Sequence, residues 1–126
     1  MKLSRIHHVA IITSDYKKAK DFYVNKLGFT IIRDNYRKDR DDYKLDLKCG
    51  DCELEIFSMK NHPQRVTNPE AYGLRHLAFY TDDIERDVKE LNKMGIKTEP
   101  IRFDSYTGNK AVFLRDPDGL PIELHE

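Results

Sequence analysis

The sequence predicts an α+β protein made of two consecutive βαβββ modules, and an internal repeat is the main evidence for this fold class. The segment HVAIITSD at 8–15 matches HLAFYTDD at 76–83, and LEI at 54–56 matches IEL at 122–124, all at one offset of 68 residues. Each repeat starts with an apolar strand pattern followed by a helix pattern, and three more strand patterns complete it. A chain of 126 residues suits one domain, so the two modules are expected to share a core.

The first module is expected to span 4–58. Its opening strand covers 6–13, and a helix begins after Asp15 with an apolar face that includes Ala19, Phe22 and Tyr23. Gly28 is a typical helix stop. The remaining strands are predicted at 30–35, 43–49 and 52–58, and a polar, proline-containing linker at 59–73 follows.

The second module is expected to span 74–126, with an opening strand at 75–81. Asp82 or Asp83 is the expected helix cap, and Gly95 is the expected stop. Between them, apolar residues recur at helical spacing, namely Ile84, Val88, Leu91 and Met94. Strands are predicted at 97–101, 110–115 and 121–125.

Charge and hydropathy exclude several classes of protein. Twenty-two basic and twenty-two acidic residues are scattered along the chain, which argues against a nucleic-acid-binding surface or a polybasic membrane anchor. No apolar run is long enough to span a membrane, and the first residues lack the apolar stretch of a signal peptide. We therefore expect a cytoplasmic protein. Cys49 and Cys52 flank Gly50-Asp51 within an alternating pattern, so they are interpreted as residues of a hairpin rather than a redox or zinc site.

Strand periodicity indicates which histidine of the first strand belongs to a site. Side chains alternate between faces, so His8 shares a face with Ala10 and Ile12, whereas His7 points the other way. The repeat favours His8, because the residue 68 positions after His7 is Arg75 and the one after His8 is His76. His7, His62 and His125 are set aside as ligands, although His125 is a candidate for a pocket wall.

Glu55 and Glu123 occupy equivalent places near the ends of the two modules. Either glutamate alone would be interpreted as a solvent-facing residue of a one-sided sheet. Each, however, follows its module's histidine by 47 residues. If a pseudo-twofold axis relates the modules, His8, Glu55, His76 and Glu123 converge on one divalent metal ion. Such ligands suit Zn, Ni, Co, Mn or Fe, and they leave two octahedral positions for water or substrate.

Several segments in this order resemble the vicinal oxygen chelate superfamily, in particular its small bacterial glyoxalase I-like metalloproteins. The matching segments are IHHVAI at 6–11, DFY at 21–23, LGF at 27–29, GLRHLAF at 73–79 and DPDGLPIEL at 116–124. The resemblance implies strands that curl into a metal-bearing cleft, as in the glyoxalase/bleomycin resistance/dihydroxybiphenyl dioxygenase fold, and it implies a homodimer. It also places the family's ligands on His8, Glu55, His76 and Glu123.

The resemblance further implies a lyase or isomerase of the lactoylglutathione lyase type. In such enzymes a carboxylate removes a carbon-bound proton next to a metal-bound oxygen of a small substrate, such as the thiol adduct of a 2-oxoaldehyde. Glu123 is favoured as that base by analogy, and Glu55 is the other candidate. The usual glutathione contacts are absent, because Ile12, Met59 and Tyr72 stand where charged or amide side chains are common.

Other members of the superfamily supply alternative functions. An epimerase would use the same proton abstraction. A fosfomycin-type thiol transferase and a ring-cleaving dioxygenase use two histidines and one carboxylate, so a fourth ligand argues against both. A small-molecule-binding resistance protein generally lacks the metal ligands, and an intact set of four therefore favours an enzyme.

Overall fold

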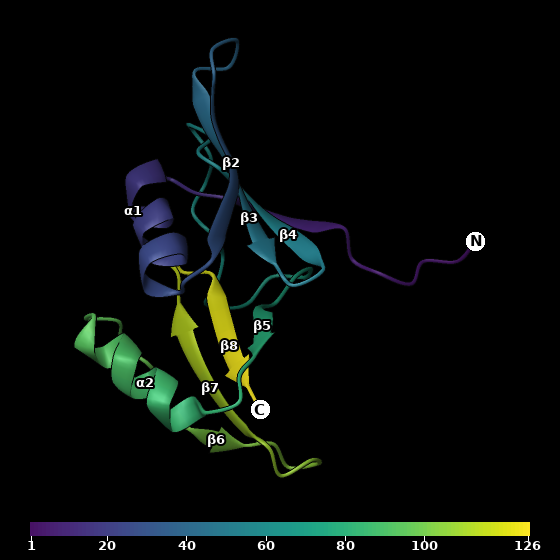
Figure 1. Ribbon diagram of the computed structural model, residues 1–126, viewed down its shortest axis with the longest axis vertical. Coiled ribbons are helices and arrows are strands. Elements are labelled where there is room, and N and C mark those ends of the chain that lie inside the picture. Colours follow the sequence, from purple (N-terminus) through teal and green to yellow (C-terminus); the bar gives the residue numbers. More distant parts are fainter. The chain divides into compact units, whose positions relative to one another are not determined.

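The computed structural model describes all residues, 1–126, and confirms the predicted fold class. The chain divides into two compact units, Met1–Pro63 and Gln64–Glu126. Each unit contains one four-stranded mixed sheet and one helical segment, and neither sheet closes into a barrel (Figure 1).

The first unit has the strand order β1-β4-β3-β2. Its strands are β1 (His8–Ile12), β2 (Thr30–Arg37), β3 (Asp42–Cys49) and β4 (Cys52–Phe57). β1 runs parallel to β4, whereas β2, β3 and β4 form an antiparallel meander. The turn between β3 and β4 lies at Gly50-Asp51, as the alternation predicted, and Cys49 and Cys52 face each other across it as free thiols.

The helical segment of the first unit differs in one respect from the prediction. Asp15 caps α1 (Tyr16–Lys20) by accepting a hydrogen bond from the Lys18 amide at 3.0 Å. The helix then widens into a π-helical stretch, η1 (Asp21–Lys26), which the apolar periodicity did not predict. The segment ends before Gly28, whose φ of 79° suits glycine.

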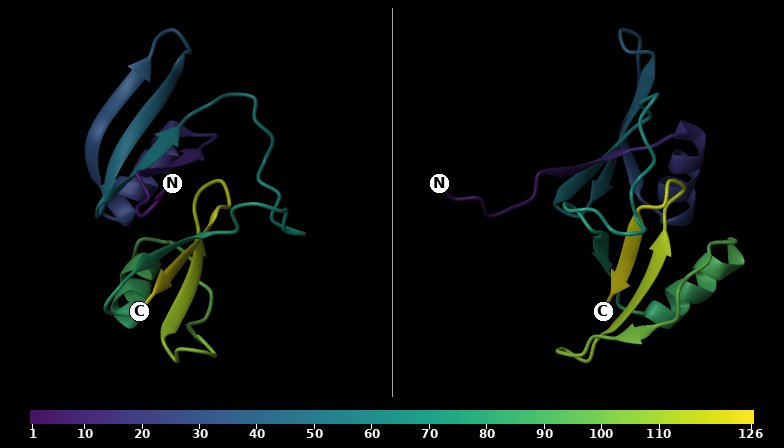
Figure 2. Two further views of the ribbon diagram at one scale, coloured as in Figure 1. Left: turned by 90° about the vertical axis from the view of Figure 1, so that its right-hand side faces the viewer. Right: turned by 180° about the vertical axis from the view of Figure 1, so that it is seen from behind.

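The second unit repeats this plan with the strand order β5-β8-β7-β6. Its strands are β5 (Leu77–Tyr80), β6 (Arg102–Phe103), β7 (Lys110–Arg115) and β8 (Pro121–His125), and its helix is α2 (Ile84–Lys93). Asp83 is the cap, accepting from the Arg86 amide at 2.9 Å. Figures 1 and 2 show α2 lying along the sheet of its own unit.

One strand prediction is wrong. Residues 97–101 form no strand, and the strand of this region is the two-residue β6, which begins at Arg102. Pro100 offers no amide hydrogen to a ladder, and only the Glu99 amide reaches the neighbouring strand, at the Phe113 carbonyl. The two opening strands are also shorter than predicted, so His76 precedes β5 rather than lying within it.

In each sheet one face carries the apolar core, and the other face, which is more polar, is only partly accessible. In the first unit the buried face carries apolar residues that are nearly inaccessible, namely Ile11, Leu45, Leu47, Leu54 and Ile56, together with Ala19, Phe22 and Tyr23 of the helical segment. In the second unit Val112, Leu114 and Ile122 of the sheet and Ile84 and Leu91 of α2 are equally buried. The opposite sheet faces are therefore available for polar chemistry.

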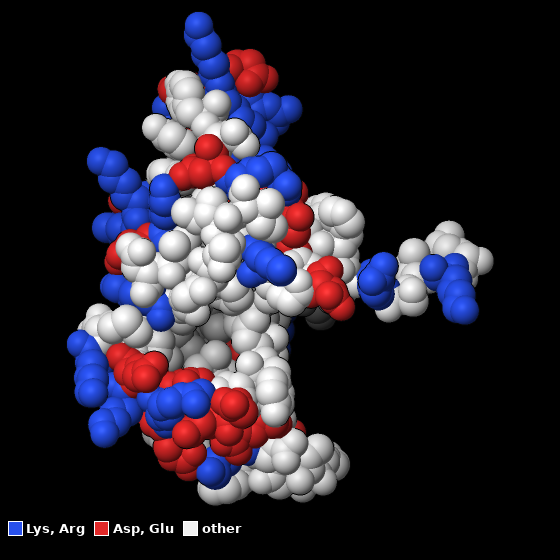
Figure 3. Space-filling view, in the orientation of Figure 1, with Lys and Arg blue, Asp and Glu red and all other residues white.

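The surface carries both signs of charge. Figure 3 shows Lys and Arg side chains interspersed with Asp and Glu over the visible face, in keeping with equal numbers of each sign in the sequence. No helix of the structure is long and apolar enough to cross a membrane.

Candidate metal centre

In the first unit, strand alternation separates the site side chains from the core. On β1, Val9 and Ile11 turn inward, whereas His8 is exposed together with Ala10. On β4, Glu55 lies between the buried Leu54 and Ile56 and faces the same side as His8, because Ala10 is paired with Glu55. The His8 Nε2 atom lies 3.6 Å from Glu55 Oε2.

The second unit builds the equivalent pair. Ala78 of β5 is paired with Glu123 of β8, as Ala10 is paired with Glu55 in the first unit. His76 stands two residues before Ala78, and its Nε2 atom lies 2.9 Å from Glu123 Oε2. The Glu123 side chain is 14% exposed and the His76 side chain 25%.

Both pairs have the spacing of two ligands on one metal ion. Nitrogen and oxygen ligands each about 2.1 Å from a metal lie about 3.0 Å apart at a right angle and about 3.4 Å apart at a tetrahedral angle. The observed separations of 3.6 and 2.9 Å are close to these values. The donor set therefore fits a divalent ion, but the structure brings these residues together as pairs and contains no group of three or more potential ligands.

His7 contributes to the first pair in a way that the sequence did not reveal. Its Nδ1 atom lies 2.8 Å from Nδ1 of His8, and the two rings meet edge to face. One of the two nitrogens donates and the other accepts. This contact occupies the far side of the His8 ring and leaves Nε2 facing Glu55, which is how a neighbouring group orients a ligating histidine.

A network of alternating charges surrounds Glu55. Lys44 Nζ lies 2.9 Å from Glu55 Oε1 and 2.7 Å from Asp46 Oδ1. Arg33 Nε lies 2.7 Å from the other Asp46 oxygen, and Arg33 Nη2 lies 2.7 Å from Glu53 Oε2. Burial raises the pKa of Asp46, but the hydrogen bonds and charges of Lys44 and Arg33 outweigh it and hold that pKa below its ordinary value.

Comparison with known proteins identifies the family. Residues 5–124 match the Glyoxalase/Bleomycin resistance protein/Dioxygenase superfamily. The chain belongs to this superfamily. It is 54% identical to the protein YwkD of Bacillus subtilis (100% of this chain, 99% of the relative) and 48% identical to YaeR of Escherichia coli (98% and 97%). The crystal structure of a glyoxalase family protein from Enterococcus faecalis is 55% identical over both full chains, with a TM-score of 0.92.

A more distant relative has a named activity. The chain is 26% identical to the mitochondrial methylmalonyl-CoA epimerase of Homo sapiens, over 98% of this chain and 74% of the epimerase. The match over residues 5–124 confirms the resemblance to the superfamily that the sequence predicted. Members of this superfamily include proteins named for different reactions, so the reaction of this chain must be argued from its own residues.

The surroundings of Glu123 differ from those of Glu55. Phe113 is the residue opposite Glu123 on β7, whereas Asp46 is the residue opposite Glu55 on β3. The Phe113 ring meets the His76 ring edge to face, with the centroids 5.1 Å apart. Glu123 pairs with His76 and with no lysine or arginine. This superfamily member thus has one pair in a charged setting and one beside an aromatic ring.

A β-bulge explains how Arg33 joins the network. The pairing of β2 with β3 shifts between Ile31 and Arg33, so that Arg33 rather than Ile32 lies opposite Asp46. The sequence signal for the network was charged residues at alternate positions of a predicted strand, namely Lys44, Asp46 and Lys48. Sequence reasoning missed it because an alternating charged face is normally solvent-exposed.

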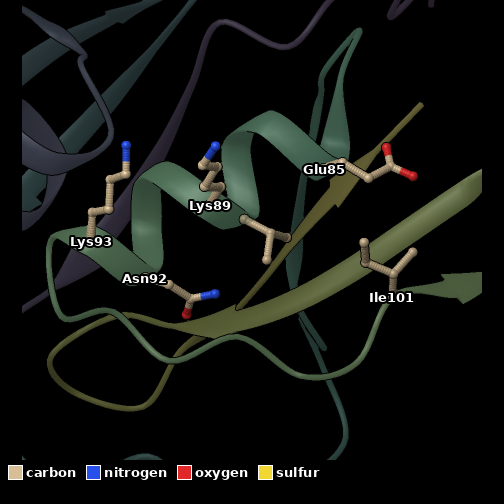
Figure 4. Close-up of a pocket in the computed structure, with 6 residues that line it drawn as sticks. Glu85, Lys89, Asn92, Lys93 and Ile101 are labelled. Carbon is tan, nitrogen blue, oxygen red and sulfur yellow. The ribbon is translucent and has the colours of Figure 1, made fainter.

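A separate shallow groove lies in the second unit, between α2 and the segment before β6. Glu85, Lys89, Asn92 and Lys93 of α2 line it with Ile101, and none of the four predicted ligands does so (Figure 4). In the close-up the two lysine side chains point away from Ile101, so the groove offers no convergent polar groups of the kind that fix a ligand. The paired histidines and glutamates remain the better candidate site.

Proposed function

We propose that His8, Glu55, His76 and Glu123 bind one divalent metal ion, chosen from Zn, Ni, Co, Mn and Fe. The observation that carries this proposal is the repeated histidine–glutamate pair, with nitrogen–oxygen separations of 3.6 and 2.9 Å at equivalent positions of two units. A single pair of this kind is common as a structural ion pair. Two equivalent pairs, in a chain whose residues 5–124 match one superfamily, are better explained by a shared metal ion.

The proposed reaction is a proton transfer of the glyoxalase I type on a small oxygenated substrate, such as the thiol adduct of a 2-oxoaldehyde. A bound divalent ion would stabilise the negative charge that develops on the two substrate oxygens. The Glu123 carboxylate removes the proton from the carbon that carries the thiol and returns it to the neighbouring carbonyl carbon. The hydroxyl proton passes to the other oxygen, so the adduct becomes a 2-hydroxy thioester with no other reactant.

Glu123 is the better base on physical grounds. Lys44 holds one oxygen of Glu55 by a charged hydrogen bond and is itself bound to Asp46, so the Glu55 carboxylate is tied to its own sheet. Glu123 lacks such a partner and lies beside Phe113, on a less polar surface. A carboxylate with fewer charged partners breaks fewer contacts when it moves toward the carbon that loses the proton.

The thiol of the substrate is proposed to differ from glutathione. Glutathione-using relatives commonly have charged or amide side chains at three positions that help to hold the tripeptide. In this chain those positions are Ile12, Met59 and Tyr72, which carry no charge. Ile12 is 48% exposed on β1, so its side chain is accessible but apolar. Simpler thiols and phosphorylated substrates are therefore the first to test.

An epimerase is the second candidate function. The 26% identity to methylmalonyl-CoA epimerase favours it, and an epimerase would also remove a proton beside a carbonyl. The two functions differ in the fate of the proton, because an epimerase returns it to the same carbon and a glyoxalase to the neighbouring one. Fosfomycin-type thiol transfer and ligand sequestration have no comparable support among the residues described above.

Solvent deuterium tests both candidates. The metal content of protein purified without added metal is measured first, and the protein is then loaded separately with Zn, Ni, Co, Mn or Fe. It is incubated in D₂O with methylglyoxal adducts of several thiols and, separately, with a 2-methyl acyl thioester. We expect metal-dependent deuterium at the carbon beside the carbonyl, and loss of this exchange in Glu123→Gln. Retained exchange in Glu123→Gln with loss in Glu55→Gln would move the base to the first unit, and exchange without metal would contradict the proposal.

A mixing experiment distinguishes a site within one chain from a site shared by two. His8→Ala and His76→Ala proteins are unfolded, mixed and refolded together. If unit one of one chain joins unit two of another, half of the sites in mixed dimers retain all four ligands and recover metal. A site within one chain gives no recovery.

A further inference from the structure

Lys44 is the charged residue in closest contact with the predicted metal ligands. It projects from β3 on the same face as Glu55, and its ammonium lies 2.9 Å from Glu55 Oε1. The other oxygen of Glu55, Oε2, is the one that faces His8 Nε2. The two oxygens of this carboxylate therefore have different partners.

Lys44 is itself held firmly. Its ammonium also contacts Asp46, which is 1% exposed and is bound on its other oxygen by Arg33. The ammonium lies 5.5 Å from the centre of the Phe57 ring, the residue opposite Lys44 on β4. A lysine with two carboxylates and an aromatic neighbour loses little further freedom when it fixes Glu55.

The second unit has no counterpart of this contact. In the first unit Lys44 of β3 lies opposite Phe57 of β4. At the equivalent place in the second unit, Ala111 of β7 lies opposite His125 of β8. Ala111 is buried and carries no charge. Both oxygens of Glu123 are thus free of any ammonium, although the two glutamates occupy equivalent positions in the repeat.

We propose that Lys44 is a positioning residue that restricts Glu55 to binding the metal through Oε2 alone and keeps Glu55 in place during the reaction. This inference rests on the proposed function, because it assumes that Glu55 is a metal ligand. It explains why two equivalent glutamates take different roles. Glu55 would remain a metal ligand, and Glu123, which has no lysine partner, would be the carboxylate that accepts the proton.

The test uses Co²⁺ alone, because its visible spectrum reports the number and geometry of its ligands. Wild-type protein, Lys44→Met, Lys44→Gln and Lys44→Arg are titrated with Co²⁺ in competition with a coloured chelator. Lys48→Met is the matched control, since Lys48 lies on the same face of β3 but is exposed, lies opposite Glu53 and forms no ion pair with Glu55. Lys44→Gln keeps a donor for Asp46 and is the alternative if Lys44→Met unfolds, which thermal unfolding without metal would reveal.

We expect Lys44→Met and Lys44→Gln to change the Co²⁺ spectrum, because the second oxygen of Glu55 becomes available to the metal. Both should also bind Co²⁺ about tenfold more tightly, since a positive charge beside the ion is removed. Lys44→Arg and Lys48→Met should resemble the wild type in affinity. A wild-type spectrum and affinity in both neutral Lys44 variants would overturn the role of Lys44 and leave the metal site intact.

A control separates this failure from failure of the proposed function. Glu55→Ala and His76→Ala are titrated in the same way, and loss of tight binding in both shows that the metal uses the proposed ligands. If the wild type binds no Co²⁺, or binds it equally well without these side chains, both the proposed function and the role of Lys44 are wrong.

Discussion

His76 and Glu123 form the closer of the two equivalent pairs, with Nε2 2.9 Å from Oε2, whereas His8 and Glu55 are 3.6 Å apart. The two glutamates also differ in their neighbours. Lys44 contacts Glu55 on the side away from His8, and no cation contacts Glu123. Each histidine is therefore a partner of its glutamate, but in the first unit it shares that glutamate with a lysine.

Removal of any one proposed ligand should weaken metal binding strongly. We expect His8→Ala, Glu55→Ala, His76→Ala and Glu123→Ala each to lower affinity by about 100-fold or more, because even the loss of a residue that only orients a ligand costs about 10- to 100-fold. His7→Ala should retain the metal with about tenfold weaker binding, at the lower end of that range, because His7 contacts the ring of a proposed ligand but is not one itself. Elemental analysis after dialysis measures how much metal each variant retains. Loss of metal in His7→Ala with retention in His8→Ala would mean that His7 is the ligand.

The sequence predicted the elements that carry this site, but not all of its contacts. Strand alternation and the repeat placed His8 and Glu55 on one face, and the structure agrees, because both obey the two-residue period of a strand. The charged network was not predictable in the same way. Arg33 reaches Asp46 only through a β-bulge, and a bulge changes register without an obvious sequence signal.

The helical and edge regions show a second limit of sequence reasoning. Apolar spacing predicted a helix ending before Gly28, but it did not distinguish the π-helical turns of η1 from α-helix. The region at 97–101 has a strand-like composition, yet β6 is confined to Arg102–Phe103. Short edge strands depend on tertiary pairing more than on local pattern. The domain bounds, the ligand set and the cytoplasmic location stay predictions.

Activity with the glutathione adduct of methylglyoxal should be weak. Ile12, Met59 and Tyr72 give no charged contact to the tripeptide, and a missing charged hydrogen bond costs about 1.5–3 kcal/mol. We expect kcat/KM for this adduct to be at least about tenfold below that for the best adduct of a smaller thiol. Absorbance of the thioester product measures both. Equal or better turnover of the glutathione adduct would show that other residues hold the tripeptide.

Core and exposed isoleucines should respond differently to truncation. Ile56 is fully buried on β4, directly after Glu55, so Ile56→Ala should lower the free energy of unfolding by about 2–5 kcal/mol. Ile12 on β1 is 48% exposed, and Ile12→Ala should change the free energy of unfolding by about 0.5 kcal/mol or less. Urea unfolding of the metal-free protein measures the change in the free energy of unfolding for both variants. Equal losses would contradict the assignment of the two sheet faces.

Cys49 should be a slow nucleophile in the folded protein. Burial is the main cause that raises the pKa of this thiol from 9.0 to about 11, and the nearby Cys52 adds to the effect. Between pH 9.0 and about 11 the folded protein keeps the thiol proton, whereas the unfolded protein releases it. The contribution of Cys49 to the free energy of unfolding therefore falls as the pH rises through this range. Peptide mapping after iodoacetamide treatment at pH 9 should show slower modification of Cys49 in native than in urea-unfolded protein. Equal rates would contradict the raised pKa.

The protein should be a homodimer in solution. β1 and β5 each pair with one neighbour only, so each leaves one edge of its sheet without a strand partner. Exposed apolar residues lie close to these edges, including Ile6 just before β1, Tyr80 of β5 and Leu74 just before β5. Open edges with apolar side chains favour association, and a closed twofold dimer is the commonest way in which proteins cover them.

Light scattering coupled to size exclusion should therefore give twice the mass of one chain at micromolar concentration. Replacing Leu74 and Tyr80 by aspartate should shift the protein toward the monomer, whereas the same change at Met94 of the α2 end should not. A wild-type monomer under these conditions would contradict the prediction.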